Sequence, residues 1–186
     1  MSLLCILTLL SCGKGYVESD ATEEEVTGGH YWSDLKSLNT RLGRYTGWVS
    51  LSVGDNQFWA RVKVVGPNTK AMHAQYLHVN GRCPQMKDDL NHDGYLDFME
   101  SYRVAGPILI PLDSNLNSQM KGLNEFPIIK GSSAFYYYSE ASNMSRMMED
   151  LRRKDTYTMD MMTKLNGKEE MRIGRRIIII YGTSDE

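Results

Sequence analysis

Apolar and polar residues alternate along much of the chain after residue 45, which is the pattern of half-buried β-strands. Residues 48–53 and 58–65 alternate in this way. The Gly-Asp-Asn sequence at 54–56 between them is typical of a turn, so this region predicts a β-hairpin. The last predicted strand contains four consecutive isoleucines, and we expect it to be buried on both faces. This last strand is predicted at residues 175–181. Three further strands are predicted at residues 72–79, 108–110 and 135–138.

One stretch has helical rather than β periodicity. Met144, Met147, Met148 and Leu151 recur at intervals of three and four residues, so they share one face of a helix that we expect to pack on the core. A second short helix is predicted at about residues 96–103. The whole pattern predicts a mainly-β fold, an antiparallel β-sandwich with one or two short helices.

The composition is that of a folded globular chain. It has 186 residues, of which 41% are hydrophobic and 24% are charged, and this length suits about one domain. The formal net charge of −2 gives no reason to expect a nucleic acid as a partner. No apolar run reaches the roughly 20 residues that a membrane-spanning helix needs.

The first twelve residues resemble a bacterial lipoprotein signal. Residues 3–10 are almost all apolar, and the sequence Leu-Leu-Ser-Cys at 9–12 resembles the lipobox, whose cysteine carries the lipid and becomes the first mature residue. The resemblance implies that Cys12 is lipidated and anchors the protein to a membrane of the bacterial cell envelope, at the outer membrane or the periplasmic face, or that the protein is secreted. The alternative is that this apolar stretch forms a buried first strand.

These features divide the chain into three regions. Residues 1–12 are the predicted signal peptide and lipobox. Residues 13–44 are an acidic tether that leads into the domain, because the stretch from 13 to 29 is small, polar and acidic without hydrophobic periodicity. Residues 45–186 are the predicted β-sandwich domain.

A calcium-binding pattern lies within this domain at residues 89–100. Its oxygen-bearing residues stand at the six ligand places of an EF-hand loop, with Gly94 at the sharp turn in place six. Calcium takes six to eight oxygen ligands, and clustered carboxylates repel one another without a cation. His92 lies between ligand places, and we expect it to face solvent. The predicted ligands are Asp89, Asn91, Asp93, Tyr95 through its carbonyl, Asp97 and Glu100.

The sequence before this loop departs from a full EF-hand. Gly81 and Pro84 exclude a long incoming helix, and no second loop is visible, since residues 113–124 lack the required glycine and glutamate. Sensor EF-hands expose a groove by opening a pair of helices, which a lone loop between strands cannot easily do. We therefore expect a structural calcium site.

The sequence around the loop resembles a protein family. Residues 73–84, 102–112 and 176–182, with the calcium loop between them, are similar to bacterial secreted proteins related to the CHRD domain, which in turn is similar to the copper/zinc superoxide dismutase sandwich. The resemblance covers roughly residues 45 to 182. It implies a β-sandwich and raises the alternative of a metal-dependent enzyme that uses His73 and His78.

Residue spacing argues against that enzyme. His73 and His78 are five residues apart, an odd offset that places them on opposite faces of one strand. The simpler interpretation is that one is buried and hydrogen-bonded and the other is exposed. Cys83 lacks an evident catalytic partner, and if Cys12 is lipidated and Cys5 is removed, it also lacks an intramolecular disulfide partner. The sequence therefore predicts a non-enzymatic, calcium-binding lipoprotein of the cell envelope with no catalytic residues and an unknown envelope or extracellular partner.

Overall fold

The computed structural model describes residues 6–11, 29–39, 44–66, 73–79, 82–116, 126, 134–151 and 173–183. Within them, eight strands form one antiparallel sheet in the order β6-β5-β8-β1-β2-β3-β4-β7. The strands are β1 (Ile6–Ser11), β2 (Gly29–Ser37), β3 (Thr46–Gly54), β4 (Gln57–Val65), β5 (Gln75–His78), β6 (Ile108–Pro111), β7 (Ala134–Ala141) and β8 (Ile177–Thr183). The helices are α1 (Phe98–Ala105) and α2 (Met144–Leu151), with short 3₁₀ turns η2 (Met86–Asp88) and η3 (Ile173–Arg175).

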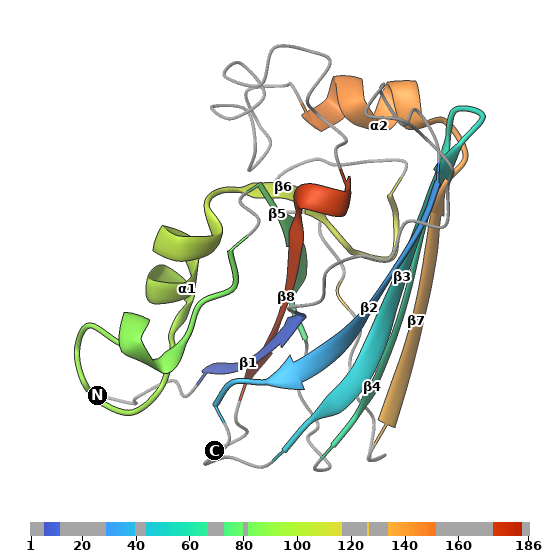
Figure 1. Ribbon diagram of the computed structural model, residues 1–186. Coiled ribbons are helices and arrows are strands. Elements are labelled where there is room, and N and C mark those ends of the chain that lie inside the picture. The colour runs from blue at the N-terminus through green and yellow to red at the C-terminus, as the bar shows by residue number, and fades with distance from the viewer. Residues whose placement is uncertain are drawn as a thin grey trace.

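The sheet folds so that its two halves enclose a core. The long strands β2, β3, β4 and β7 form one wall, and β8 with the short strands β5 and β6 lies apart from it (Figure 1). The main apolar cluster joins Val62 and Val64 of β4 to Leu77 of β5, Ile110 of β6 and Ile178 of β8. The mainly-β, sandwich-like fold predicted from the sequence is thereby confirmed.

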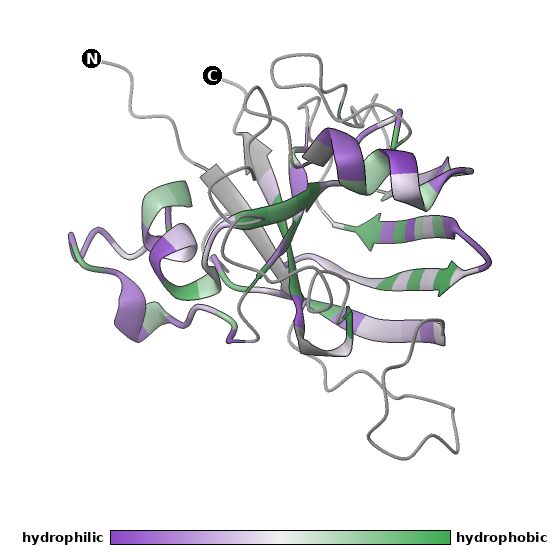
Figure 2. Ribbon diagram, turned by 90° about the horizontal axis from the view of Figure 1, so that it is seen from above, coloured by the Kyte–Doolittle hydropathy of each residue, from purple (hydrophilic) through white to green (hydrophobic). Residues whose placement is uncertain are grey.

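The predicted hairpin is formed by β3 and β4. Its two central turn residues, Asp55 and Asn56, have φ angles of 46° and 61°, the left-handed conformation of a tight two-residue hairpin turn. Bands of hydrophobic residues alternate with more polar ones along β3 and β4 (Figure 2). The inward residues of β4, among them Phe58 and Val62, are buried, as the alternation predicts.

Helix α2 packs its methionines on the core beside this hairpin turn. Met147 and Met148 are buried and Met144 packs against the core, as their spacing predicts, whereas the side chain of Leu151 lies outside the described part of the structure. The turn also holds the start of the helix, because the Asn56 carboxamide oxygen accepts hydrogen bonds from the Ser145 backbone N–H (2.8 Å) and hydroxyl (2.7 Å). In the described part of the chain, no helix is both long and apolar enough to cross a membrane.

Strand β8 is buried on both faces, as its isoleucine run predicts. Ile178 and Ile180 belong to the main core, whereas Ile177, Ile179 and Tyr181 belong to a second cluster on the opposite face. Residues of the 82–105 segment complete that second cluster, including Cys83, Phe98 and Ala105. Strand β8 therefore lies between the main core and the segment that carries the predicted calcium loop (Figure 1).

The sheet begins earlier than the predicted domain boundary at residue 45. Strand β2, which the sequence placed in the tether leading into the domain, pairs with β3 over eight residue pairs. The sequence pattern missed it because its outward residues are polar or aromatic and only Leu35 on its inward face is a fully buried aliphatic residue. Residues 12–28, the main part of the tether, lie outside the described residues.

Strand β1 occupies the middle of the sheet. It pairs with β8 over six residue pairs and with β2 over three. This arrangement, a first strand within the sheet, corresponds to the alternative to a signal peptide. Cleavage before Cys12 would remove β1, so the predicted lipobox processing and the eight-stranded sheet exclude each other in the mature protein.

Candidate calcium site

The predicted calcium loop connects η2 to α1. Its exit is the start of α1, where Asp97 is the N-cap residue and Glu100 stands three residues later. The Asp97 carboxylate accepts a hydrogen bond from the Glu100 N–H (2.8 Å), and the Glu100 carboxylate accepts one from the Asp97 N–H (3.1 Å). This reciprocal capping box fixes the last two ligand places relative to each other. The helix begins at Phe98, two residues later than predicted.

The approach to the loop is a 3₁₀ turn and not a helix, as Gly81 and Pro84 predict. The turn is held by Asp88, whose carboxylate accepts hydrogen bonds from both guanidinium nitrogens of Arg82 at 3.1 Å. These bonds hold the pKa of Asp88 below its usual range. The loop therefore enters through a short, tethered turn and leaves through a helix.

The backbone of the loop has the conformation that a calcium loop requires. Gly94 at place six has φ 84°, and His92 at place four has φ 58°, and both values lie in the left-handed region. The His92 side chain is exposed, as predicted. The sharp turn is thus formed by the chain itself.

The side chains of the first three predicted ligands also accept hydrogen bonds from backbone N–H groups inside the loop. Asp89 accepts from Gly94 (2.8 Å), Asn91 accepts from Asp93 (3.0 Å), and Asp93 accepts from Tyr95 (2.8 Å). Each bond uses one side-chain oxygen and turns the side chain back toward its own loop. A bond from the Asn91 amide to Asp93 (3.1 Å) links two of these ligands.

Glu100 closes the loop from its far end. Its side chain is buried, and one carboxylate oxygen accepts from the N–H groups of Leu90 (2.8 Å) and Asn91 (3.3 Å). Because the second oxygen accepts from Asp97, the carboxylate spans the beginning and the end of the loop. The structure therefore brings places two, three and nine together around the carboxylate of place twelve.

One buried carboxylate oxygen in this loop has no hydrogen-bond partner. Asp89 is only 6% exposed, and its Oδ1 contacts no donor, whereas its Oδ2 accepts from Gly94. An unpartnered buried carboxylate oxygen is costly, and a cation would satisfy it. Among the described residues, no group of three or more His, Cys, Asp and Glu side chains meets the arrangement of a metal centre. The predicted ligand set also draws on the Asn91 amide and the Tyr95 carbonyl.

A residue that sequence reasoning missed supports the loop from outside. Asn39 follows β2, and its buried side chain donates a hydrogen bond to the Leu96 carbonyl (3.1 Å) and accepts one from the Leu96 N–H (2.9 Å). Leu96 stands at place eight of the loop and is fully buried. No periodicity or motif in the sequence connects positions 39 and 96, so only the fold reveals this contact.

The expectation that one of His73 and His78 is exposed is wrong. Both are buried, with exposed fractions of 1% and 0%. Burial lowers the pKa of each, and the pKa of His78 falls to about 4. The reason is that β5 packs on both apolar clusters, through Leu77 on the main core and Tyr76 on the second cluster, and His73 lies just before this strand. The His78 Nδ1 donates to the Gly106 carbonyl at 2.7 Å.

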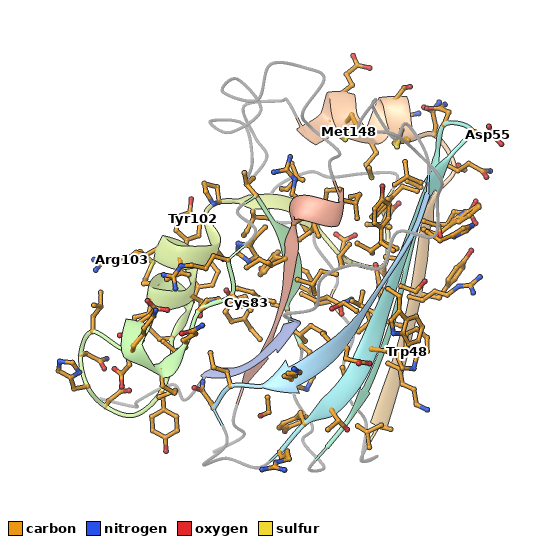
Figure 3. The ribbon with its side chains drawn as sticks, in the orientation of Figure 1. Trp48, Asp55, Cys83, Tyr102, Arg103 and Met148 are labelled. Atoms are coloured by element: carbon orange, nitrogen blue, oxygen red, sulfur yellow. The ribbon has the colours of Figure 1, made fainter. Side chains whose placement is uncertain are left out.

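Cys83 is disulfide-bonded, in contrast to the expectation that it lacks a partner. It lies between α1 and β8, whereas Arg103 projects from α1 toward solvent (Figure 3). The other two cysteines, Cys5 and Cys12, lie outside the described residues, and so does the predicted lipid attachment point. Removal of residues 1–11 with lipidation of Cys12 would leave neither of them free for Cys83.

Comparisons with protein-family models, with curated proteins and with solved structures give no match to this chain. The resemblance to CHRD-related proteins therefore stays a prediction from the sequence.

Proposed function

We propose that this protein is a non-enzymatic calcium-binding protein in which the loop at residues 89–100 holds one structural Ca²⁺. The observation that carries the proposal is the unpartnered, buried Oδ1 of Asp89, in a loop that has a glycine of left-handed conformation at place six. The oxygens of Asp89, Asn91, Asp93, Asp97 and Glu100, with the Tyr95 carbonyl, supply the hard ligands that calcium prefers. The bound ion would neutralise their mutual repulsion.

The surroundings of the loop favour a structural role over a sensor role. The helix that leaves the loop packs through Phe98 and Ala105 on β8, so the loop is attached to a strand that is buried on both faces. A sensor needs a pair of helices that can open, whereas the approach here is the short turn η2. We therefore expect calcium to stabilise the fold with little change in the exposed apolar surface.

Calcium should raise the free energy of unfolding. A ligand that binds only the folded state stabilises it by about 2.7 kcal/mol when its free concentration is 100 times the dissociation constant. Thermal unfolding followed by circular dichroism, with calcium added and then removed by a chelator, measures the effect. Magnesium is the matched control and should stabilise much less, because it demands a tighter octahedron and gives up its water reluctantly.

Isothermal titration calorimetry decides the assignment. One calcium ion per chain, bound in the millimolar range or tighter, supports the proposal. No heat of binding and no change in melting temperature at millimolar calcium would show that the loop is only an acidic surface turn. A large calcium-dependent increase in binding of a hydrophobic dye would instead indicate a sensor.

The compartment is a separate part of the proposal. The disulfide at Cys83 supports an oxidising location such as the cell envelope or the extracellular space. The membrane anchor at Cys12 stays a prediction, and the intact mass of the native protein tests it. A chain that begins at Cys12 and carries a lipid supports the anchor, whereas a chain that retains residues 6–11 supports the eight-stranded sheet.

A further inference from the structure

We infer that Asn39 is a positioning residue of the calcium site and that its side-chain amide replaces the second loop with which EF-hand loops commonly pair. The inference rests on the proposed calcium function and extends it beyond the loop at residues 89–100. It assigns a role in metal binding to a residue 50 positions before the first ligand.

The contact has the hydrogen bonds of an antiparallel strand pair, with the Asn39 side chain in the place of one strand. In an antiparallel pair, a residue exchanges both its N–H and its C=O with the residue opposite it. Leu96 at the centre of the calcium loop exchanges both groups with the Asn39 carboxamide, at 2.9 Å and 3.1 Å. An asparagine side chain carries one acceptor and a pair of donor hydrogens on a planar group, as a backbone amide carries a donor and an acceptor.

The contact is buried and distant in sequence. Asn39 is 1% exposed, Leu96 is fully buried, and 57 residues separate them. A buried carbonyl and N–H without partners would each cost about 1 to 3 kcal/mol. The Asn39 amide therefore supplies hydrogen-bond partners for the Leu96 backbone, which pairs with none of the described strands.

This bond also orients a predicted calcium ligand. The N–H of Leu96 and the carbonyl of Tyr95 belong to the same peptide group, which is planar and has the two groups pointing in opposite directions. When the Leu96 N–H points at Asn39, the Tyr95 carbonyl points away from Asn39. Asn39 thus fixes the direction of the backbone ligand at place seven without touching the ion.

The placement of Asn39 connects the loop to the sheet. Asn39 comes two residues after the end of β2, and the intervening Leu38 packs on the second apolar cluster beside β8. Partners that orient metal ligands from the second layer typically contribute 10- to 100-fold to metal affinity. We expect a contribution of this size from Asn39.

Calcium titration of Asn39→Ala and Asn39→Gln variants tests the inference. The alanine variant should bind calcium 10- to 100-fold more weakly than the native protein. The glutamine variant carries the same amide one methylene farther out and should lie between the two. The matched control is Gln75→Ala, because Gln75 is also a fully buried amide that donates to a loop carbonyl, Leu112 O at 2.8 Å, but lies away from the calcium loop. It should lower the melting temperature and change the calcium dissociation constant by less than about twofold.

Hydrogen exchange gives a second measurement that needs no variant. The Leu96 amide of the native protein should exchange as slowly as the amides of neighbouring strands, even in chelator, because its partner is Asn39 and not the ion. Fast exchange of Leu96 in chelator, or equal calcium affinity in the native and Asn39→Ala proteins, would overturn the inference. Absence of calcium binding by the native protein would instead overturn the proposed function, and this outcome is distinct because it is independent of Asn39.

Discussion

Replacement of Glu100 by glutamine is expected to lower calcium affinity by more than about 100-fold. A supporting residue contributes up to about 100-fold, and Glu100 is expected to bind the ion directly through both oxygens. The substitution removes one negative charge and replaces one acceptor oxygen by an NH₂ group. That group would face backbone N–H groups of Leu90, Asn91 or Asp97 that now donate to the carboxylate.

The same substitution should also destabilise the protein without calcium. Glu100 is the third residue of α1 and half of its capping box, and loss of a capping interaction costs about 0.5 to 2 kcal/mol. Calorimetry measures the affinity, and chemical unfolding in chelator measures the stability.

His92→Asn is the matched control for Glu100→Gln. His92 lies in the same loop, is exposed, and has a left-handed φ of 58° that asparagine tolerates. Calcium affinity should therefore change little in this variant. Equal calcium affinity of the Glu100→Gln and native proteins would show that Glu100 serves only as a helix cap and that the ion, if bound, uses other ligands.

The local pattern of apolar residues predicted three elements. The β3–β4 hairpin and the methionine face of α2 follow from periodicity, because apolar spacing reports which side of an element meets the core. Strand β8 follows from its continuous run of isoleucines, which predicts burial on both faces. Strand β2 was not predicted because its outward face carries Trp32 among polar residues and its inward face has one fully buried aliphatic residue, Leu35. The local composition of residues 29–37 therefore did not indicate a strand, and only the pairing with β3 shows one.

The proposed calcium loop is the part of the candidate site that the sequence indicates most directly. Its predicted ligands lie within twelve consecutive residues, so the sequence displays them without knowledge of the fold. Asn39, the disulfide of Cys83 and the burial of His73 and His78 depend on which segments the sheet brings together. These features are long-range, and no local pattern could indicate them.

His78 should make the protein less stable as the pH falls below about 6.5. Burial disfavours the charged imidazolium, and the hydrogen bond to Gly106 opposes this effect only in part, so the pKa of His78 falls from 6.5 to about 4. Between these two values the unfolded chain binds a proton that the folded chain does not, and acidification therefore favours unfolding. The complete effect is about 3 kcal/mol below pH 4 and is absent above the unfolded pKa.

The groups around His78 do not offset this effect. The centroid of the Tyr76 ring lies 6.2 Å from that of the His78 ring in an edge-on arrangement, and burial raises the pKa of Tyr181, which therefore carries no charge in acid. His73 is buried as well, its pKa is also lowered, and it acts in the same direction. The His78 Nε2 is the ring nitrogen that would take up the proton. Among the described residues it has no hydrogen-bond partner that could stabilise the charged ring.

A His78→Asn variant isolates this contribution. Asparagine can still donate a hydrogen bond to the Gly106 carbonyl but cannot become charged, so its stability should depend less on pH. Chemical unfolding from pH 7 to pH 4.5 in chelator should show the native protein losing about 2 kcal/mol more than the variant. The quantity compared is the slope with pH, because the smaller side chain lowers the stability of the variant at every pH. Parallel slopes in the two proteins would show that His78 accepts a proton in the folded state at its ordinary pKa, and therefore that β5 opens to solvent on its histidine-bearing face.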